Sequence, residues 1–356
     1  ATVLAFKREL LDQLCRVAKA LASTLRLKDE AAALRGLLSA YALIIGLWQV
    51  ANPPARVRLL HEELRGVPKE LGAGFTLEIN GRPLFCGGAN WIPADSFLPR
   101  VSPERYRALL QAAVDANMNM VRVWGGGVYE VDAFYDLCDE LGLMVWQDFL
   151  FACGIYPATP WFQDSVRAEA EAALVRLRHH PSIVLWCGNN EDYALARSLG
   201  RYPAAAGAGG EGPAVVDPFP ARVIYEELLP KVCAALDPER PYWPGSPYGG
   251  DDPNTGDQGD RHTWDVWHGA MAEYQAYPRY AGRFVSEFGM QAHPAMETLK
   301  RWLPAEDLAP ESAGLLHHNK ADQGPARLHY YMHQNLPVPP DLAGQVYASQ
   351  LMQAEA

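Results

Sequence analysis

Short apolar runs alternate with longer amphipathic stretches along most of the chain from residue 84 onward. Apolar runs rich in β-branched and aromatic residues predict strands, whereas apolar residues three or four positions apart predict helices. The predicted strands cover residues 84–91, 119–124, 143–149, 182–187, 242–248 and 283–288, and the predicted helices cover 131–140, 165–178, 221–236 and a segment that begins at Ser102-Pro103. Strands separated by helices form βαβ units, so we expect an α/β fold with a parallel sheet.

Two parallel α/β folds are compatible with this alternation, a doubly wound sheet and a (β/α)8 barrel. A doubly wound sheet would carry a G-x-G-x-x-G phosphate loop after its first strand. The run Trp124-Gly-Gly-Gly-Val128 lacks that spacing, and we interpret its glycines as backbone room beside a ligand. Residues 200–218 and 249–262 predict long loops, which barrel enzymes carry at their strand ends. The pattern therefore favours a (β/α)8 TIM-type barrel.

The first part of the chain follows a different pattern. Leucine and valine recur at helical spacing between residues 10 and 21, separated by charged and polar residues. We therefore predict a helical N-terminal segment over residues 1–54, which Asn52-Pro53-Pro54 ends. Within residues 75–86, alternating apolar residues flank the turn pair Asn80-Gly81, which predicts a β-hairpin.

The composition limits the kinds of partner. Hydrophobic residues make up 49% of the 356 residues, enough for a substantial core. The formal net charge of −11 argues against a nucleic-acid partner, because phosphate binding needs clustered Lys and Arg. The longest mainly apolar run, residues 41–50, is far shorter than the roughly 20 residues of a membrane span. We therefore expect neither a nucleic-acid nor a membrane partner, and the pattern indicates no particular oligomeric state.

The cysteines bear on the cellular compartment. None of them shows a paired spacing such as C-x-x-C; they are Cys15, Cys86, Cys138, Cys153, Cys187 and Cys233. Charged residues at positions 7–9 interrupt any apolar secretory segment at the start. We therefore expect reduced thiols and a cytoplasmic protein.

Two acidic residues end apolar runs that have strand composition. Glu191 follows the run 182–187 by a few residues, and Glu287 lies within 283–288. Catalytic groups of a (β/α)8 barrel lie at the C-terminal ends of its strands. Two carboxylates placed in this way are typical catalytic residues of a glycosidase, in which one donates a proton to the leaving oxygen and the other attacks the sugar. The alternative is that each acid forms an unrelated salt bridge.

Neighbouring polar residues fit the same site. Alternation along a strand places Arg122 and Trp124 on one face, and an arginine inside a barrel wall needs an acid partner, whose pKa it would lower. Asp148 shares a face with Trp146 and suits a bidentate hydrogen bond to two sugar hydroxyls, unless it caps a helix. Asn190 could bond the sugar 2-hydroxyl, a contact that strengthens in the transition state. An Arg122 that faces the outer helices is the alternative for that residue.

Tryptophans recur at or just beyond the predicted strand ends. They are Trp91, Trp124, Trp146, Trp186, Trp243, Trp264 and Trp267. Each could be a core residue, but a ring of them at one end of several strands suits sugar stacking, so Trp264 and Trp267 join the substrate-binding candidates. The four histidines at 262, 268, 317 and 318 lack the i, i+4 spacing of a helical zinc site. We expect neither a metal nor an organic cofactor.

Five ordered motifs carry a family resemblance. They are Gly88-Ala-Asn-Trp-Ile-Pro-Ala-Asp-Ser-Phe97, Arg122-Val-Trp-Gly-Gly-Gly-Val-Tyr-Glu130, Trp146-Gln-Asp-Phe149, Leu185-Trp-Cys-Gly-Asn-Asn-Glu191 and Val285-Ser-Glu-Phe-Gly289. Together they resemble the catalytic domain of the β-mannosidases of glycoside hydrolase family 2. The resemblance implies a (β/α)8 barrel and a retaining mechanism, with Glu191 as acid/base after strand four and Glu287 as nucleophile after strand seven. It also implies that Trp124, Asp148 and Asn190 hold the terminal mannose.

The chain departs from that family at both ends. Family members carry β domains before the barrel, whereas we expect a helical segment of uncertain role at 1–54 and a linker or remnant β strand at 55–73. Residues 74–356 are the expected glycosidase barrel. Residues 347–354 resemble the helix that precedes strand eight, so we expect a barrel that is incomplete at strand eight. Either the chain is a fragment, or the closing strand comes from elsewhere.

The resemblance suggests a mechanism and leaves two alternatives. Glu287, ionised and steadied by Arg122, would attack a terminal β-mannoside of an oligosaccharide, and Glu191 would be protonated because its site is partly apolar. A family-2-like β-glycosidase of another specificity (β-glucosidase, β-galactosidase or exo-β-glucosaminidase) would use the same residues. A non-catalytic carbohydrate-binding fragment is the alternative from another class.

Overall fold

The computed structural model describes residues 75, 77–79, 82–202 and 218–356. The helical segment predicted at 1–54, the segment 55–73 and most of the loop predicted at 200–218 lie outside these residues. The described residues divide into two compact units, one of residues 299–348 and the other of the described residues up to 298 together with 349–356. The second unit contains all the strands found in the described residues. Among the described residues, no helix is long and apolar enough to cross a membrane.

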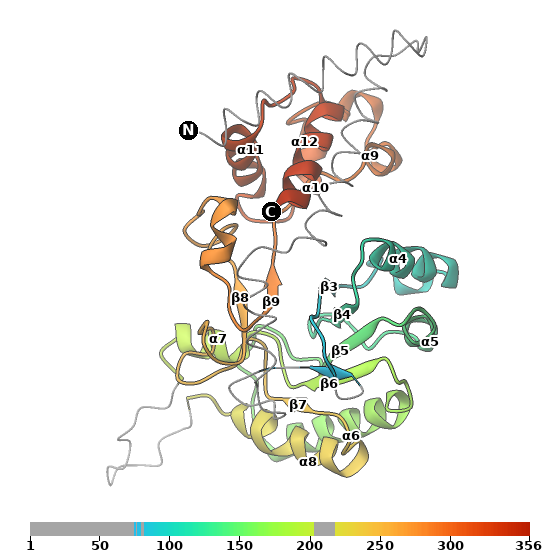
Figure 1. The fold of residues 1–356 in the computed structure, drawn as a ribbon, viewed down its shortest axis with the longest axis vertical. Coiled ribbons are helices and arrows are strands. Elements are labelled where there is room, and N and C mark those ends of the chain that lie inside the picture. The colour runs from blue at the N-terminus through green and yellow to red at the C-terminus, as the bar shows by residue number, and fades with distance from the viewer. Residues whose placement is uncertain (1–74, 76, 80–81, 203–217) are drawn as a thin grey trace. The chain divides into compact units, whose positions relative to one another are not determined.

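The strands of this unit form a hairpin and two parallel sheets (Figure 1). In the predicted hairpin, β1 (Glu78–Ile79) pairs antiparallel with β2 (Arg82–Pro83), which confirms it; its turn pair lies outside the described residues. The five-stranded sheet has the order β3-β4-β5-β6-β7, with β3 (Gly88–Trp91), β4 (Met120–Val123), β5 (Met144–Asp148), β6 (Ile183–Cys187) and β7 (Tyr242–Trp243). The two-stranded sheet pairs β8 (Asp260–Thr263) with β9 (Phe284–Phe288).

Helices alternate with the strands of the five-stranded sheet, and α4, α5, α6 and α8 lie along one side of it (Figure 1). The helices are η2 (Leu98–Arg100), α4 (Pro103–Asp115), α5 (Asp132–Leu141), α6 (Pro160–Leu177), α7 (Asp192–Ser198), η3 (Ile224–Leu228), α8 (Leu229–Leu236) and η4 (Tyr274–Arg279). Nearer the C-terminus come α9 (Met296–Trp302), η5 (Ala305–Asp307), α10 (Ala313–His318), α11 (Gly324–Asn335) and α12 (Leu342–Glu355). The α/β fold with a parallel sheet is confirmed, whereas the described strands do not complete an eight-stranded barrel.

The local sequence explains two of these boundaries. The Ser102 side chain accepts a hydrogen bond from Arg105 N at the start of α4, with Pro103 in the first turn, as the sequence predicts. The strand predicted over 242–248 ends at Trp243 because Pro244 follows and has no N–H to donate to a ladder. The predicted loop 249–262 is wrong at its end, since β8 begins at Asp260. Its polar residues hid it, because a buried strand normally reads as an apolar run.

Side chains of the five-stranded sheet alternate between two buried clusters. Val121 and Val145 pack with the helices on the outer face, whereas Met120, Met144 and Trp146 pack inside. Arg122 is in register with Trp146, and its guanidinium lies 5.6 Å from the centre of that ring. Arg122 therefore faces inward, which rules out the alternative that it faces the outer helices.

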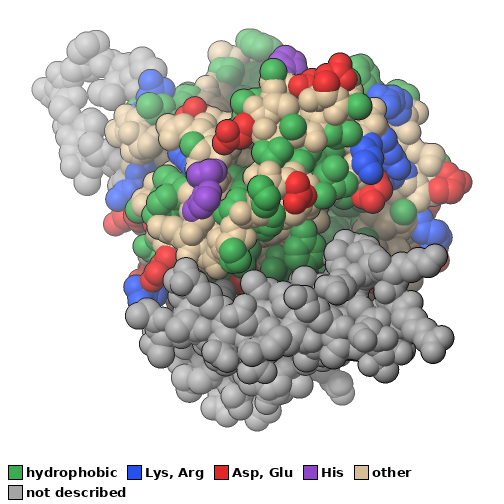
Figure 2. All heavy atoms as spheres, turned by 90° about the horizontal axis from the view of Figure 1, so that it is seen from above, with side chains coloured by type: hydrophobic (Ala, Val, Ile, Leu, Met, Phe, Trp, Pro, Cys, Tyr) green, Lys and Arg blue, Asp and Glu red, His purple; other side chains and the backbone are tan. Residues whose placement is uncertain are grey.

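The unit that contains residues 299–348 is helical in its described part. Ser312 caps α10 by accepting a hydrogen bond from Leu315 N, and α11 buries Leu328, Tyr331 and Met332. On the face drawn in Figure 2, acidic and basic side chains are interspersed with hydrophobic ones rather than gathered by sign.

Candidate active site

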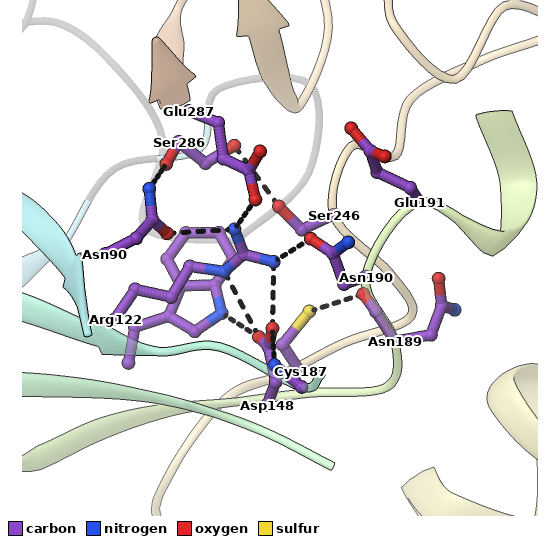
Figure 3. Close-up of polar contacts among 12 residues, drawn as sticks. Asn90, Arg122, Asp148, Cys187, Asn189, Asn190, Glu191, Ser246, Ser286 and Glu287 are labelled. Carbon is purple, nitrogen blue, oxygen red and sulfur yellow. Dashed lines mark hydrogen bonds and ion pairs between the residues drawn. The ribbon is translucent and has the colours of Figure 1, made fainter. Parts of the chain in front are cut away.

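The predicted site residues gather where the strands end. Arg122 lies on β4, Asp148 ends β5, Asn190 and Glu191 follow β6, and Glu287 lies on β9. Figure 3 shows Arg122 at the centre, with side chains from these elements pointing toward it. The loop after β6 is fixed to the segment after β7, because Glu191 N donates to the Ser246 carbonyl oxygen at 2.7 Å. The ends of strands that are far apart in sequence thus meet at one place.

The two glutamates lie close together. A carboxylate oxygen of Glu191, one of Glu287 and a ring nitrogen of His262 all lie within 4.8 Å of one another. Retaining glycosidases hold their carboxyl groups about 5–5.5 Å apart, and inverting enzymes hold them about 6.5–9.5 Å apart. The separation of these oxygens agrees with the retaining arrangement.

Arg122 connects the site to the sheet. It is 4% exposed, and its guanidinium donates to Glu287 Oε1 at 2.7 Å, to Asp148 Oδ2 at 2.8 Å, to Asn190 Oδ1 at 2.8 Å and to Asn90 Oδ1 at 3.1 Å. Burial acts to lower the pKa of Arg122, but the charges of Asp148 and Glu287 outweigh it and raise that pKa. A permanent cation therefore lies against the proposed nucleophile, as the sequence predicts.

Asp148 is enclosed by the protein. It is fully buried, and its carboxylate accepts hydrogen bonds from Arg122, from Gly125 N at 3.0 Å and from Trp146 Nε1 at 2.8 Å. Burial raises its pKa despite the opposing influence of Arg122. Both oxygens are occupied, so the geometry favours a positioning role toward Arg122 over the predicted contact with sugar hydroxyls.

Glu191 has an unusual backbone and two hydrogen-bond donors. Its φ of 62° is left-handed, a conformation that costs a non-glycine residue energy and that clusters at functional sites. Its Oε1 lies 2.8 Å from His262 Nδ1, and its Oε2 accepts from the Cys153 thiol at 3.4 Å. The side chain is 31% exposed. This carboxylate is thus more accessible than that of Glu287.

The electrostatics of Glu191 differ from the sequence expectation. Burial does act to raise its pKa, as expected of a partly apolar site. The hydrogen bond and charge of His262, the Cys153 thiol and the charge of Arg122 outweigh burial and lower the pKa below its usual value. The expectation that apolar surroundings keep Glu191 protonated is therefore wrong, because its polar neighbours lower the pKa instead.

The tryptophan candidates fall into different places. Trp264 donates through Nε1 to Glu287 Oε2 at 3.3 Å, which puts it in the site. Trp267 is 3% exposed and offers little surface to a ligand. Trp124 is half-buried, and a Cβ at Gly126 would lie 2.0 Å from its ring. The glycines after Trp124 therefore make room for that ring and for the Asp148 contact, rather than only for a ligand.

The sequence interpretation missed His262, Cys153, Ser246 and Asp260. The polar strand β8 carries His262 and Asp260 with their side chains on one face, two residues apart. That spacing was the available signal, but the predicted loop over this segment concealed it. Cys153 lies in a loop after β5, where its pattern carries no signal for a contact with Glu191.

Metal-type donor atoms come close together at two places in the described residues. One is the group of Glu191, His262 and Glu287, and the other joins Asp136, Asp139 and His180. In both groups the histidine Nδ1 is hydrogen-bonded to a carboxylate, at 2.8 Å from Glu191 and at 2.7 Å from Asp139. These bonds satisfy the nitrogen and the oxygen without an ion.

Comparisons with known proteins match most of the chain to one group. The chain is 48% identical over 306 residues to β-mannosidase B of Thermothelomyces thermophilus, covering 84% of this chain and 35% of that protein. It is 47% identical over 310 residues to β-mannosidase B of Aspergillus flavus, covering 86% of this chain and 36% of that protein. These matches confirm the resemblance to β-mannosidases. The chain spans about a third of the length of these relatives.

Solved structures agree on the fold. The β-D-mannosidase from Dictyoglomus thermophilum superposes with a TM-score of 0.71 at 49% identity, over 79% of this chain and 33% of that one. An exo-chitosanase from Amycolatopsis orientalis gives a TM-score of 0.52 at 20% identity over 78% of this chain and 32% of that one, which shows a shared fold alone. Residues 1–69 match a family model described as "Tetracyclin repressor-like, C-terminal domain". That match covers far less than half of the chain.

Proposed function

We propose that this chain is the catalytic portion of a retaining, exo-acting glycoside hydrolase that removes terminal β-D-mannose from oligosaccharides. The observation that carries the proposal is the pair of carboxylates, with oxygens within 4.8 Å and with the buried Arg122 on one of them. The identity of 48% to a β-mannosidase B supports the choice of mannose. We further propose a (β/α)8 barrel in which β3 to β9 are strands one to seven.

The reaction proceeds by double displacement. Glu287, whose carboxylate accepts a hydrogen bond from Arg122 at 2.7 Å, attacks the anomeric carbon while the bond to the leaving oxygen breaks, and Glu191 gives that oxygen a proton. A glycosyl ester on Glu287 results. Glu191 then takes a proton from water, whose oxygen attacks the same carbon and releases Glu287. The configuration is retained, and no step needs a metal or an organic cofactor.

The remaining residues are proposed to bind the sugar or to position the catalytic groups. Trp264 at the nucleophile, with Trp124 and Asn190, is proposed to contact the terminal sugar, and Trp267 stays a weaker candidate because of its burial. Asp148 is proposed to hold Arg122 rather than the sugar. The substrate is the proposed partner, with neither nucleic acid nor membrane, as the charge of −11 favours. Five cysteines in the described residues are free, which supports the predicted cytoplasmic location.

A panel of nitrophenyl β-glycosides tests the activity and the sugar together. We expect the purified 356-residue chain to hydrolyse the β-mannoside faster than the β-glucoside, β-galactoside and β-glucosaminide. NMR of the first-formed sugar should show the β anomer. Preference for another sugar would transfer the proposal to that glycoside, and binding of mannosides without turnover would favour the non-catalytic alternative.

A further inference from the structure

A row of buried polar side chains lies behind Glu191. His262 Nδ1 lies 2.8 Å from Glu191 Oε1, His262 Nε2 lies 3.0 Å from Ser246 Oγ, and Ser246 Oγ lies 2.6 Å from Asp260 Oδ2. His262 is 2% exposed, and Ser246 and Asp260 are fully buried. With little water available, the hydrogens in this row must come from the side chains themselves.

The hydrogens of the row can be assigned from its distances. Asp260 Oδ2 lies 2.6 Å from Ser246 Oγ and 2.5 Å from Ser286 Oγ, and two oxygens this close need a hydrogen between them. Each serine has one hydroxyl hydrogen. A hydroxyl donates more strongly to a carboxylate than to the neutral acceptors at 3.0 and 3.2 Å, so we assign the Ser246 hydrogen bond to Asp260.

The second oxygen of Asp260 also has two donors. Asp260 Oδ1 accepts hydrogen bonds from Trp243 Nε1 at 2.8 Å and from Tyr248 N at 3.0 Å. Four polar hydrogens around one carboxyl group suit its ionised form, because a protonated carboxyl would have to donate one of these bonds itself. We therefore take Asp260 as the negative end of the row.

This assignment decides the state of His262. Because the Ser246 hydroxyl donates its hydrogen bond to Asp260, the Ser246 oxygen can only accept a hydrogen bond from His262 Nε2. The other ring nitrogen faces the Glu191 carboxylate and must also donate. A histidine that donates from both nitrogens is an imidazolium.

The charges around His262 suit an imidazolium. Glu191 faces it from the end of β6, and Glu287 Oε2 faces it from β9 at 3.4 Å. Asp260 acts on it through Ser246 from its own strand. Arg122 of β4 is the nearby cation, and it bonds Oε1 of Glu287, whereas His262 faces Oε2. Three carboxylates thus surround one ring.

We propose that His262 stores the proton that Glu191 delivers to the leaving oxygen, and that Ser246 and Asp260 stabilise the charged form of His262 between deliveries. This inference rests on the proposed glycosidase function. The proton passes from Nδ1 to the Glu191 carboxylate, leaving the electron pair on Nδ1. Rotation about Cγ–Cδ presents the new O–H to the leaving oxygen, which takes the proton as its bond to carbon breaks. In the second step the proton from water returns along the same path.

The stored proton explains how Glu191 can act as an acid although its pKa is lowered. The pKa of Glu191 is lowered, which by itself would leave an acid catalyst without its proton. Two interacting groups titrate as a pair, and a proton held on either member stays available to both. His262 is therefore a positioning and proton-holding residue, and it does not need to touch the substrate.

Asp260→Asn gives the sharpest test because it reverses the direction of the hydrogen bonds. Asn Oδ1 can keep the bonds from Trp243 and Tyr248, while Nδ2 now donates to both serines. Ser246 then has its hydrogen free for His262 Nε2, which makes the ring neutral. Ser286→Ala is the matched control, because it removes one donor to Asp260 and leaves that of Ser246 in place.

Nitrogen NMR of the full chain with ¹⁵N-labelled histidine reads this state directly, with the signals of His262 identified by their loss in His262→Gln. At neutral pH we expect both ring nitrogens of His262 to be protonated in the native chain and in Ser286→Ala. Nε2 should lose its proton in Asp260→Asn, or in Ser246→Ala if Asp260→Asn does not fold. An unprotonated Nε2 in the native chain would overturn the proposal, whatever the chain hydrolyses.

The pH profile of kcat/KM supplies the catalytic readout. The Glu191–His262 pair shares one proton that either residue can hold. The pair therefore loses this proton at a pH no lower than the pH at which Glu191 alone would lose it. Asp260→Asn should therefore move the alkaline limb to lower pH, by about one pH unit, as one neighbouring charge commonly does. Ser286→Ala should leave the limb in place. A slower Asp260→Asn enzyme with an unmoved limb would reveal a merely structural role. A native chain without mannosidase activity would refute the proposed function but leave the NMR result to decide the state of His262.

Discussion

The two glutamates of the site have opposite surroundings. Glu287 is 8% exposed and is held by Arg122, which stays charged at any relevant pH. Glu191 is more exposed and is held by the ionisable ring of His262 and by the neutral Cys153 thiol. The proposed nucleophile must remain an anion, whereas an acid/base must gain and lose a proton within one cycle. A permanent cation beside Glu287 suits a nucleophile, and an ionisable ring beside Glu191 suits an acid/base.

Removing the nucleophile should have the largest effect. Glu287→Ala should lower turnover of a β-mannoside by on the order of 10⁴-fold or more, the scale on which the loss of a reacting group acts in hydrolases. The fold should persist, because Arg122 keeps its bonds to Asp148, Asn90 and Asn190. Activity assays and thermal unfolding check both statements. Glu297→Ala, an exposed glutamate on α9, is the control, and equal activity in the two variants would refute the assignment.

Breaking the fixed cation should damage both stability and rate. Arg122→Met leaves Asp148 and Glu287 buried without their charge partner, which costs about 3–5 kcal/mol in the free energy of unfolding. Arg122→Lys keeps the charge but cannot bond several acceptors from a planar fork, so it should retain more stability than Met. Denaturant unfolding followed with turnover measures this order. Full stability of Arg122→Met would show that the buried ion pairs are unimportant.

The acid/base should matter less when the leaving group needs no proton. Glu191→Ala should lose about 10²–10⁴-fold in rate on a substrate with a poor leaving group and far less on one with an activated phenol. Added azide should restore some rate and give a β-mannosyl azide, since the small anion fits where the carboxylate was. Steady-state rates with both substrates, with and without azide, test this. An equal loss on both substrates, with no rescue, would count against Glu191.

The two parts of the site were not equally predictable from the sequence. The Arg122 side follows from strand alternation and from the cost of burying an arginine, both of which are local properties of β4. The strands β4, β5 and β6 were predictable because buried parallel strands read as apolar runs. The strand β9 was predictable from the apolar residues on both sides of Glu287, whereas only the second half of the strand predicted at 84–91 forms β3. The part of the site around Glu191 depends on strand β8. The sequence of β8 predicts a loop because it contains the polar residues Asp260 and His262, which are buried in the structure. Their partners lie far along the chain, so only tertiary structure brings them together.

The thiol on Glu191 should have the smallest effect, and its sign sharpens the comparison. Burial, followed by Glu191, raises the pKa of Cys153 to about 12, so near neutral pH the thiol keeps its hydrogen and donates it to Oε2. This bond helps to lower the pKa of Glu191, so Cys153→Ala should let that pKa rise and keep Glu191 protonated to a higher pH. Any movement of the alkaline limb should be upward, opposite to that of Asp260→Asn. It should be only a few tenths of a pH unit, because S–H is a weak donor. Cys153→Ser keeps a donor and should follow the native profile. A downward movement in Cys153→Ala would mean that the thiol does not act on Glu191 as a donor.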